Sequence, residues 1–235
     1  MNYFPLPPPF KTPVEKVRAV LGVPTAFRLE DFPGFSPQDL RNLQRYYSTQ
    51  RARHLSPEKK VGWQTAESQR VRFEAMASVE PLEGMKVLDL GCGLGGFYGF
   101  LKEKEIRVDY TGVDLFPLLI AEARKLNPGV RFETRVLLSQ PFPPRSFDYL
   151  FLSGVFNVRV RDNWKYMRSL LGCALKQSRR AVAFNVLNAD ADLREADRFG
   201  ARPKDLVSFC RRLSPSRVHL LDHYHPLDLT VFLYK

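Results

Sequence analysis

Short apolar runs alternate with amphipathic segments from residue 86 to the end of the chain. The apolar runs predict strands at 86–90, 108–114, 130–136, 147–153, 181–187, 217–221 and 228–234, and the segments between them predict helices at 95–104, 117–126, 163–176 and 203–213. Such alternation is typical of a mostly parallel sheet with helices on both faces. We therefore predict an α/β fold with a seven-stranded, mostly parallel sheet.

The last two predicted strands are joined only by residues 222–227. This connection is too short for a crossover helix, so we expect the final strand to be antiparallel. Strand 217–221 should run parallel to the others, which places the connection at the carboxyl edge of the sheet. Open α/β sheets bind their ligands beyond that edge.

The first part of the chain shows a different pattern, with many prolines and phenylalanines over residues 1–35. Three helical stretches are predicted there: 14–21, a helix that Ser36 caps and that ends near residue 51, and 64–79. We expect a loop around Ser56-Pro57. The pattern predicts two domains, an N-terminal extension and helical cap at 1–84 and a core α/β domain at 85–235.

The composition is that of a globular protein, with 44% apolar and 26% charged residues. No run approaches the ~18–20 apolar residues that span a bilayer, and residues 1–10 lack a basic region followed by an apolar run, so we expect no membrane segment and no secretory signal. The cysteines, Cys92, Cys173 and Cys210, form no Cys-x-x-Cys pair. We interpret them as reduced thiols of a cytoplasmic protein without a metal site.

The net charge of +11 favours anionic partners, including nucleic acid. The basic residues are spread widely, with one local stripe at Arg161, Lys165 and Arg168. This spacing predicts one face of a helix, which is either a solvated surface or a surface that faces RNA. RNA therefore stays open as a partner, and the oligomeric state is not indicated.

A glycine-rich loop, Gly91-Cys92-Gly93-Leu94-Gly95-Gly96, follows the first predicted strand and opens a helix. Glycines in such a turn let the backbone approach a ligand closely. Gly91, Gly93 and Gly96 also satisfy G-x-G-x-x-G, the dinucleotide fingerprint. The spacing alone therefore does not separate a nicotinamide dinucleotide from S-adenosylmethionine.

Three features favour S-adenosylmethionine. Asp89 lies two residues before the first glycine, where a carboxylate suits a ligand that carries an ammonium group. The closing strands are predicted to be antiparallel, whereas a six-stranded dinucleotide fold is all parallel. Residues 94–100 contain no lysine or arginine, which a pyrophosphate would favour near the helix start.

The stretch Val87-Leu88-Asp89-Leu90-Gly91-Cys92-Gly93-Leu94-Gly95 resembles the first motif of class I S-adenosylmethionine-dependent methyltransferases at every position. The order of strands and helices is similar to that family over about residues 85–235. The chain also resembles uncharacterised bacterial methyltransferase-domain proteins at Ser153–Asn157 and Ala183–Leu187. The resemblance implies a Rossmann-like methyltransferase domain and S-adenosyl-L-methionine as the cofactor.

The resemblance also implies a set of cofactor-binding residues. In the family, an acid at the place of Asp114 accepts hydrogen bonds from both ribose hydroxyls, although it would serve a dinucleotide ribose equally well. Val136 stands where an Asp often meets adenine, so we expect apolar adenine contacts. The predicted cofactor-binding residues are Asp89, Gly91, Cys92, Gly93, Gly95, Asp114, Leu115, Leu137, Ser153 and Gly154, with Trp63 and Arg72 from the cap. Packing is the alternative for Trp63 and Cys92.

Three side chains beyond strand ends are candidate catalytic residues: Asn157, His223 and His225. The two imidazoles titrate near neutrality and are candidate general bases, with a polar turn as the alternative for both. Asn157 can donate and accept hydrogen bonds, so it is a candidate for orienting a substrate group. Methyl transfer from a sulfonium requires no metal, because positioning supplies most of the effect.

We interpret the chain as a methyltransferase that acts on an oxygen or nitrogen atom, with a small-molecule acceptor favoured. Ser153–Asn157 differs from the Asn/Asp-Pro-Pro-Tyr/Phe motif of many methylases of exocyclic or amide nitrogens, and the chain has no Pro-Cys nucleophile of the 5-methylcytosine type. The alternatives are an RNA methyltransferase, a non-catalytic methyltransferase-like binding protein and an oxidoreductase.

Overall fold

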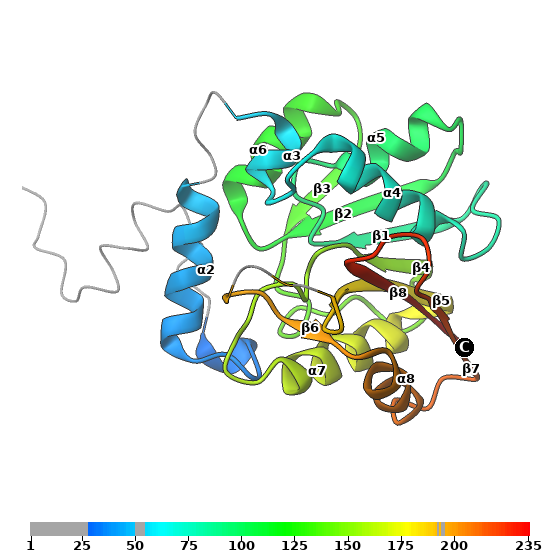
Figure 1. The fold of residues 1–235 in the computed structure, drawn as a ribbon. Coiled ribbons are helices and arrows are strands. Elements are labelled where there is room, and N and C mark those ends of the chain that lie inside the picture. Colours follow the sequence, from blue (N-terminus) through cyan, green and yellow to red (C-terminus); the bar gives the residue numbers. More distant parts are fainter. Residues whose placement is uncertain (1–27, 50–54, 192, 194–195) are drawn as a thin grey trace, which may run out of the picture.

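The computed structural model describes residues 28–49, 55–191, 193 and 196–235. Over these residues, eight strands form one sheet in the order β3-β2-β1-β4-β5-β8-β7, with β6 beside β5 (Figure 1). The strands are β1 Lys86–Leu90, β2 Asp109–Asp114, β3 Arg131–Thr134, β4 Phe147–Leu152, β5 Ser178–Asn188, β6 Gly200–Ala201, β7 Arg217–Leu221 and β8 Asp228–Tyr234. The predicted α/β fold is confirmed.

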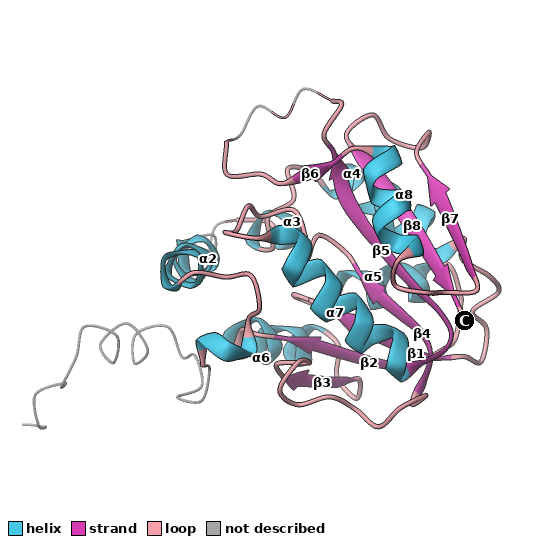
Figure 2. Cartoon of the chain, turned by 90° about the horizontal axis from the view of Figure 1, so that it is seen from below, coloured by secondary structure: helices cyan, strands magenta, loops and turns pink. Residues whose placement is uncertain are grey.

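Helices cover both faces of this sheet, as predicted. Figure 1 shows α4, α5 and α6 on one face and α7 and α8 on the other, and Figure 2 shows α2 standing apart at one side. The helices are η1 Leu29–Asp31 (a 3₁₀ turn), α2 Pro37–Thr49, α3 Pro57–Lys60, α4 Ala66–Ala77, α5 Gly96–Glu103, α6 Pro117–Leu126, α7 Asn163–Gln177 and α8 Pro203–Arg211. No helix of this described part is long and apolar enough to cross a membrane.

The strand directions agree with the prediction. β8 is antiparallel to both β5 and β7, and the other pairs are parallel. The eighth strand, β6, was not predicted, because a two-residue Gly-Ala strand has no apolar run. It pairs with the end of β5 at Leu187 and Asn188, beyond the last pair that β4 makes at Phe184.

Some predicted boundaries are corrected by the structure. The expected loop at Ser56-Pro57 is the start of the four-residue helix α3, which is too short to show a helical period. β3 ends at Thr134 and not at 136, because Thr134 is the last residue that pairs with β2. The predicted helix at 14–21 and the predicted helix end near residue 51 lie outside the described residues.

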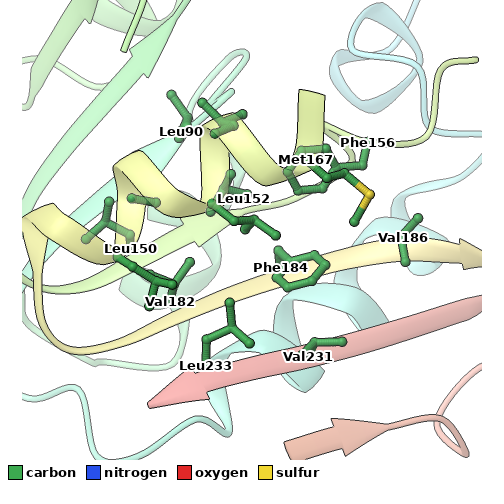
Figure 3. Packing of buried hydrophobic residues seen from close by; sticks show 14 of the residues in the cluster. Leu90, Leu150, Leu152, Phe156, Met167, Val182, Phe184, Val186, Val231 and Leu233 are labelled. Atoms are coloured by element: carbon green, nitrogen blue, oxygen red, sulfur yellow. The ribbon is translucent and has the colours of Figure 1, made fainter. Parts of the chain in front are cut away.

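Both faces of the central strands are buried. On one face, α7 packs over a cluster drawn from β4, β5 and β8; Figure 3 labels Leu90, Leu150, Leu152, Phe156, Met167, Val182, Phe184, Val186, Val231 and Leu233. On the other face, Phe151 contacts Phe97 of α5, with ring centroids 4.7 Å apart. Burial on both sides explains the continuous apolar runs and holds the strand ends rigid.

We call the described residues before β1 (28–49 and 55–85) the N-terminal segment. Residues 34–39 of this segment form hydrogen bonds with the turn before α7. The N–H of Asp162 donates to the carbonyl of Gly34 at 2.9 Å, and the N–H of Arg161 donates to the Asp39 carboxylate at 3.0 Å. Gly34 has a φ of +92°, and an added Cβ would lie 2.3 Å from the Asp162 carbonyl oxygen. Only glycine therefore fits this contact.

We expect Gly34→Ala to detach the segment from the core. The added methyl group meets backbone, which cannot move aside, so denaturant unfolding should show a loss of at least about 1 kcal/mol, and protease should cut near residues 28–49. Gly99→Ala is the matched control, because nothing lies within 4 Å of its added Cβ in helix α5. It should gain up to about 1 kcal/mol. Equal stability of the two variants would contradict this account.

Candidate functional site

A cavity lies at the carboxyl ends of β1, β2 and β4. The core lines it with residues such as Asp89, Gly91 and Asp114, and the N-terminal segment lines it with residues such as Phe35 and Trp63. The space is about 1170 Å³ with its open mouth included. Ligand sites in proteins are concave and mostly apolar with a few polar groups, and the lining of this cavity, with Asp89 and Asp114 among mostly apolar residues, has that character.

The glycine loop forms the cavity wall above β1. Gly91 and Gly93 have φ values of +78° and +54°, and an added Cβ at either would lie 2.7 Å from a valine methyl group. Both line the cavity, so a ligand can approach the backbone directly. Gly95, which precedes α5, and Cys92 lie outside the lining.

Cys92 is buried and packs toward β2. Its Sγ lies 3.0 Å from the position of a Cβ added at Gly112. Burial and the nearby carboxylates raise the pKa of its thiol well above the usual range. The geometry favours the packing role that the sequence left open for Cys92.

Asp89 is a buried carboxylate that lines the cavity. The Tyr110 hydroxyl donates to its Oδ2 at 2.5 Å. Burial raises the pKa of Asp89 to about 7, against the lowering effect of the Tyr110 hydrogen bond, and the charge of Asp114 raises it further. A ligand with a positive charge would stabilise the ionised form.

Asp114 ends β2 and is also buried on the cavity. Its Oδ2 accepts the N–H of Gly93 at 2.9 Å, and its Oδ1 accepts the N–H of Phe116 at 3.0 Å. Burial raises the pKa of Asp114, while these backbone bonds lower it. Because a carboxylate oxygen accepts about two hydrogen bonds, the Asp114 carboxylate keeps capacity for a ligand hydroxyl.

Trp63 and Arg72 form a stack beside the loop that follows β4. Trp63 lines the cavity, and an added Cβ at Gly154 would lie 3.1 Å from its ring. The Arg72 guanidinium lies 4.8 Å from the Trp63 ring centroid and pairs with the buried carboxylate of Asp228. Arg72 is outside the lining, so it contacts Trp63 and does not face the cavity.

The remaining predicted cofactor residues lie around the cavity. Leu115, Leu137, Ser153 and Gly154 all line it. The side-chain oxygen of Asn185, from the middle of β5, accepts the Gly154 N–H at 2.7 Å and so holds this loop in place. After β3, the lining consists of Arg135 followed by the apolar residues Val136, Leu137 and Leu138.

None of the three candidate catalytic residues lies on the cavity lining. The side chain of Asn157 is buried, and its Oδ1 has no hydrogen-bond partner within the described chain. The His223 side chain is 79% exposed on the β7–β8 turn. The Nδ1 of His225 accepts the Leu227 N–H at 3.1 Å, and burial together with the Arg72 charge lowers the pKa of His225.

Several lining residues had no signal in the sequence. They are Asp31, Phe32, Phe35, Leu43, Tyr47 and Tyr166. None belongs to a motif, and all except Tyr166 come from the N-terminal segment. The ring of Tyr47 lies 4.8 Å from that of Phe116, the second residue after Asp114. The phenylalanine-rich composition of residues 1–35 was the sequence feature most closely related to these aromatic lining residues.

Comparison with known proteins identifies the family of the chain. The family model described as a methyltransferase domain matches residues 87–178. A protein of Mycobacterium tuberculosis (strain ATCC 25618 / H37Rv), Rv1506c, which is named as a methyltransferase, is 30% identical over 169 residues, covering 68% of this chain and 99% of that relative. The chain belongs to the class I S-adenosylmethionine-dependent methyltransferases.

Other methyltransferases match less of their own length or share the fold alone. Trans-aconitate 2-methyltransferase of Escherichia coli (strain K12 / DH10B) is 41% identical over 125 residues, which cover 43% of this methyltransferase and 48% of the relative. Magnesium protoporphyrin IX methyltransferase from Synechocystis PCC 6803 has a TM-score of 0.57 at 12% identity, covering 83% and 99% of the two chains. Phosphoethanolamine N-methyltransferase 1 from Haemonchus contortus has a TM-score of 0.60 at 12% identity, covering 83% and 48%.

S-adenosylmethionine is the cofactor of this methyltransferase, and the cavity has matching chemistry. Asp89, a buried carboxylate that pairs with no cation among the described residues, suits the ammonium group of the cofactor. The free acceptor positions of Asp114 suit a ribose diol, and the loop at Gly91 and Gly93 has no space for side chains. The apolar wall at Leu137 suits an adenine ring.

We expect Asp89→Asn to change how stability depends on pH. The raised pKa of Asp89 means that the folded state keeps a proton that the unfolded chain releases near pH 4. This contribution to stability is present below pH 4 and is lost as pH rises through about 7. The free energy of unfolding, measured at pH 5 and pH 8, should therefore differ less in Asp89→Asn than in the wild type. In Asp109→Asn, an exposed site at the start of β2, the wild-type difference should persist.

We expect Asp228→Ala to destabilise the fold by about 3–5 kcal/mol, because it leaves the buried Arg72 guanidinium without a counter-charge. The double variant Arg72→Met, Asp228→Leu removes both charges and should recover part of the loss. Urea unfolding measures both free energies. A cost under about 1 kcal/mol for Asp228→Ala would show that the pair does not hold this region together.

Proposed function

We propose that this methyltransferase transfers a methyl group from S-adenosylmethionine to an oxygen or nitrogen atom of a small molecule. The observation that carries the proposal is the cavity itself, which the N-terminal segment lines on one side and the strand ends line on the other. The relatives and structural neighbours that are named for trans-aconitate, magnesium protoporphyrin IX and phosphoethanolamine support a small acceptor.

The proposed cofactor site uses the residues that line the cavity at the strand ends. Asp89 would meet the ammonium group, and Asp114 would accept the ribose hydroxyls. Leu115 and Leu137 would contact adenine, while Trp63 would close the site at the methionine end. The loop from Gly91 to Gly95 and the Ser153-Gly154 turn would supply backbone contacts, with Cys92 and Arg72 supporting them from outside the lining.

The chemical step needs positioning more than acid–base help. S-adenosylmethionine supplies a methyl group that is already electrophilic. The protein would hold the acceptor atom in line with that methyl group and keep water out, an effect on the order of 7–11 kcal/mol when orientation is good. We assign no proton transfer to His223, His225 or Asn157, because none of them is among the residues that line the cavity.

RNA is the second candidate acceptor. Arg161, Lys165 and Arg168 are all exposed at the start of α7, on the face that the sequence singled out. If RNA were the acceptor, binding to it should weaken steeply with salt. Methyl transfer to a small molecule should show no such dependence.

We expect Asp114→Ala to lower the affinity for S-adenosylhomocysteine at least about 100-fold. The variant loses two charge-assisted hydrogen bonds, each contributing roughly 1.5–3 kcal/mol, and also frees the Gly93 N–H. Isothermal titration calorimetry measures the change, with Asp109→Ala as the control at the other, exposed end of the same strand. Unchanged affinity in Asp114→Ala, or binding of NADH in place of the thioether, would refute the proposed cofactor site.

A further inference from the structure

The cavity is acidic, although the protein as a whole carries a net charge of +11. Among the described residues, its charged lining consists of Asp31, Asp89, Asp114 and Arg135. An acceptor that carries a carboxylate or phosphate would normally be held by a free arginine or lysine. Whether such an acceptor fits therefore depends on whether Arg135, the one cation of the described lining, is free to bind it.

Arg135 is already engaged by the protein. Its Nη2 lies 2.9 Å from Oε2 of Glu133, and its Nη1 donates to the carbonyl of Gln140 at 2.8 Å. The guanidinium also stacks on the Phe142 ring, 4.1 Å from the centroid. Its charge is balanced by Glu133, so it is not free to hold an anionic group of an acceptor.

The part of the lining that is not assigned to the cofactor is mostly aromatic and aliphatic, with Asp31, Gln69 and Arg135 as exceptions. The ring of Phe35 lies 5.7 Å from that of Phe32 and 4.9 Å, edge-on, from that of Tyr166. The aliphatic residues of the same lining include Val158, Val160 and Leu170. We call Phe32, Phe35 and Tyr166 the aromatic wall.

Tyr166 adds one polar group to this wall. Its side chain is mostly buried, and its hydroxyl makes no hydrogen bond within the described chain although the residue lines the cavity. Burial and the charge of Asp114 raise the pKa of Tyr166, so the hydroxyl stays protonated and can donate. A neutral oxygen or nitrogen on a ligand would satisfy it.

We propose that the acceptor is an uncharged aromatic compound with a hydroxyl or amino group, which packs against the aromatic wall and hydrogen-bonds to Tyr166. This inference rests on the proposed function. The acceptor's lone pair forms the new bond to the methyl carbon, the carbon–sulfur bond of the donor breaks with its electron pair passing to sulfur, and the acceptor's proton passes to solvent. Anionic acceptors, such as the trans-aconitate that names one relative, would find no unengaged arginine or lysine in the described lining.

The test compares matched probes on protein loaded with S-adenosylhomocysteine. Each pair has one neutral and one anionic member on the same ring, for example methyl 4-hydroxybenzoate and 4-hydroxybenzoate, over one- to three-ring phenols and anilines. Calorimetry and ligand-observed NMR give the affinities. We expect neutral members to bind at least about tenfold more tightly than their anionic partners. Equal or tighter binding of the anionic members, or no binding of any neutral probe, overturns the inference.

Two variants test the wall itself. Phe35→Arg introduces a free cation and should move the preference toward anionic members, whereas Leu126→Arg, at an exposed site outside the cavity, should not. Tyr166→Phe keeps the ring and should weaken hydroxyl- or amine-bearing probes several-fold without affecting rings that lack these groups. An unchanged preference in Phe35→Arg and unchanged affinities in Tyr166→Phe would overturn the role of the wall.

Failure of this inference can be told apart from failure of the proposed function. If S-adenosylhomocysteine does not bind the wild-type protein, the proposed function fails, and the inference fails with it. If it binds and the anionic probes are preferred, only the acceptor class is wrong. Methyl transfer from labelled S-adenosylmethionine to the preferred probe then checks that bound probes are acceptors.

Discussion

Two carboxylates are buried at the carboxyl ends of adjacent parallel strands. The rest of the site depends on the groups that offset the free-energy cost of this burial. Asp89 lies near the end of β1 and Asp114 at the end of β2. Tyr110 and two backbone N–H groups offset part of this cost, yet burial still raises the pKa of both aspartates. A ligand with an ammonium group and a diol would supply the missing partners.

The same hydrogen bonds that hold the carboxylates also shape the loop. Asp114 accepts the N–H of Gly93, which lies 21 residues earlier in the chain, and so ties the end of β2 to the glycine loop. That loop needs left-handed backbone at Gly91 and Gly93, and neighbouring valines leave no space for a Cβ. The glycine loop, the end of β2 and the cavity that they line are thus connected by the same hydrogen bonds.

The sequence predicted the parts of the site that lie close together along the chain. The run from Val87 to Gly95 holds the strand, the acid and the loop in nine residues, and Asp114 follows at the end of the next apolar run. The parallel sheet could be predicted because burial on both faces leaves long apolar runs. The antiparallel closing strands could be predicted because their connection is short.

Contacts between distant residues could not be predicted. Arg72 pairs with Asp228, 156 residues away, and this pairing turns it away from the cavity where the sequence placed it. Tyr110 looked like an ordinary strand residue, yet it holds Asp89. The aromatic wall joins Phe32 and Phe35 to Tyr166 across more than 130 residues. The histidines of the closing turn reach the correct edge of the sheet but lie off the cavity lining.

The exchange of protons on ligand binding tests the central claim most directly. If burial keeps Asp89 partly protonated near pH 7 until an ammonium group arrives, binding of S-adenosylhomocysteine should release a fraction of a proton at that pH. Calorimetry in buffers of different ionisation enthalpy measures this release, which should shrink between pH 7 and pH 8 and be absent in Asp89→Asn. Binding with no proton release at pH 7, or with proton uptake, would contradict the account.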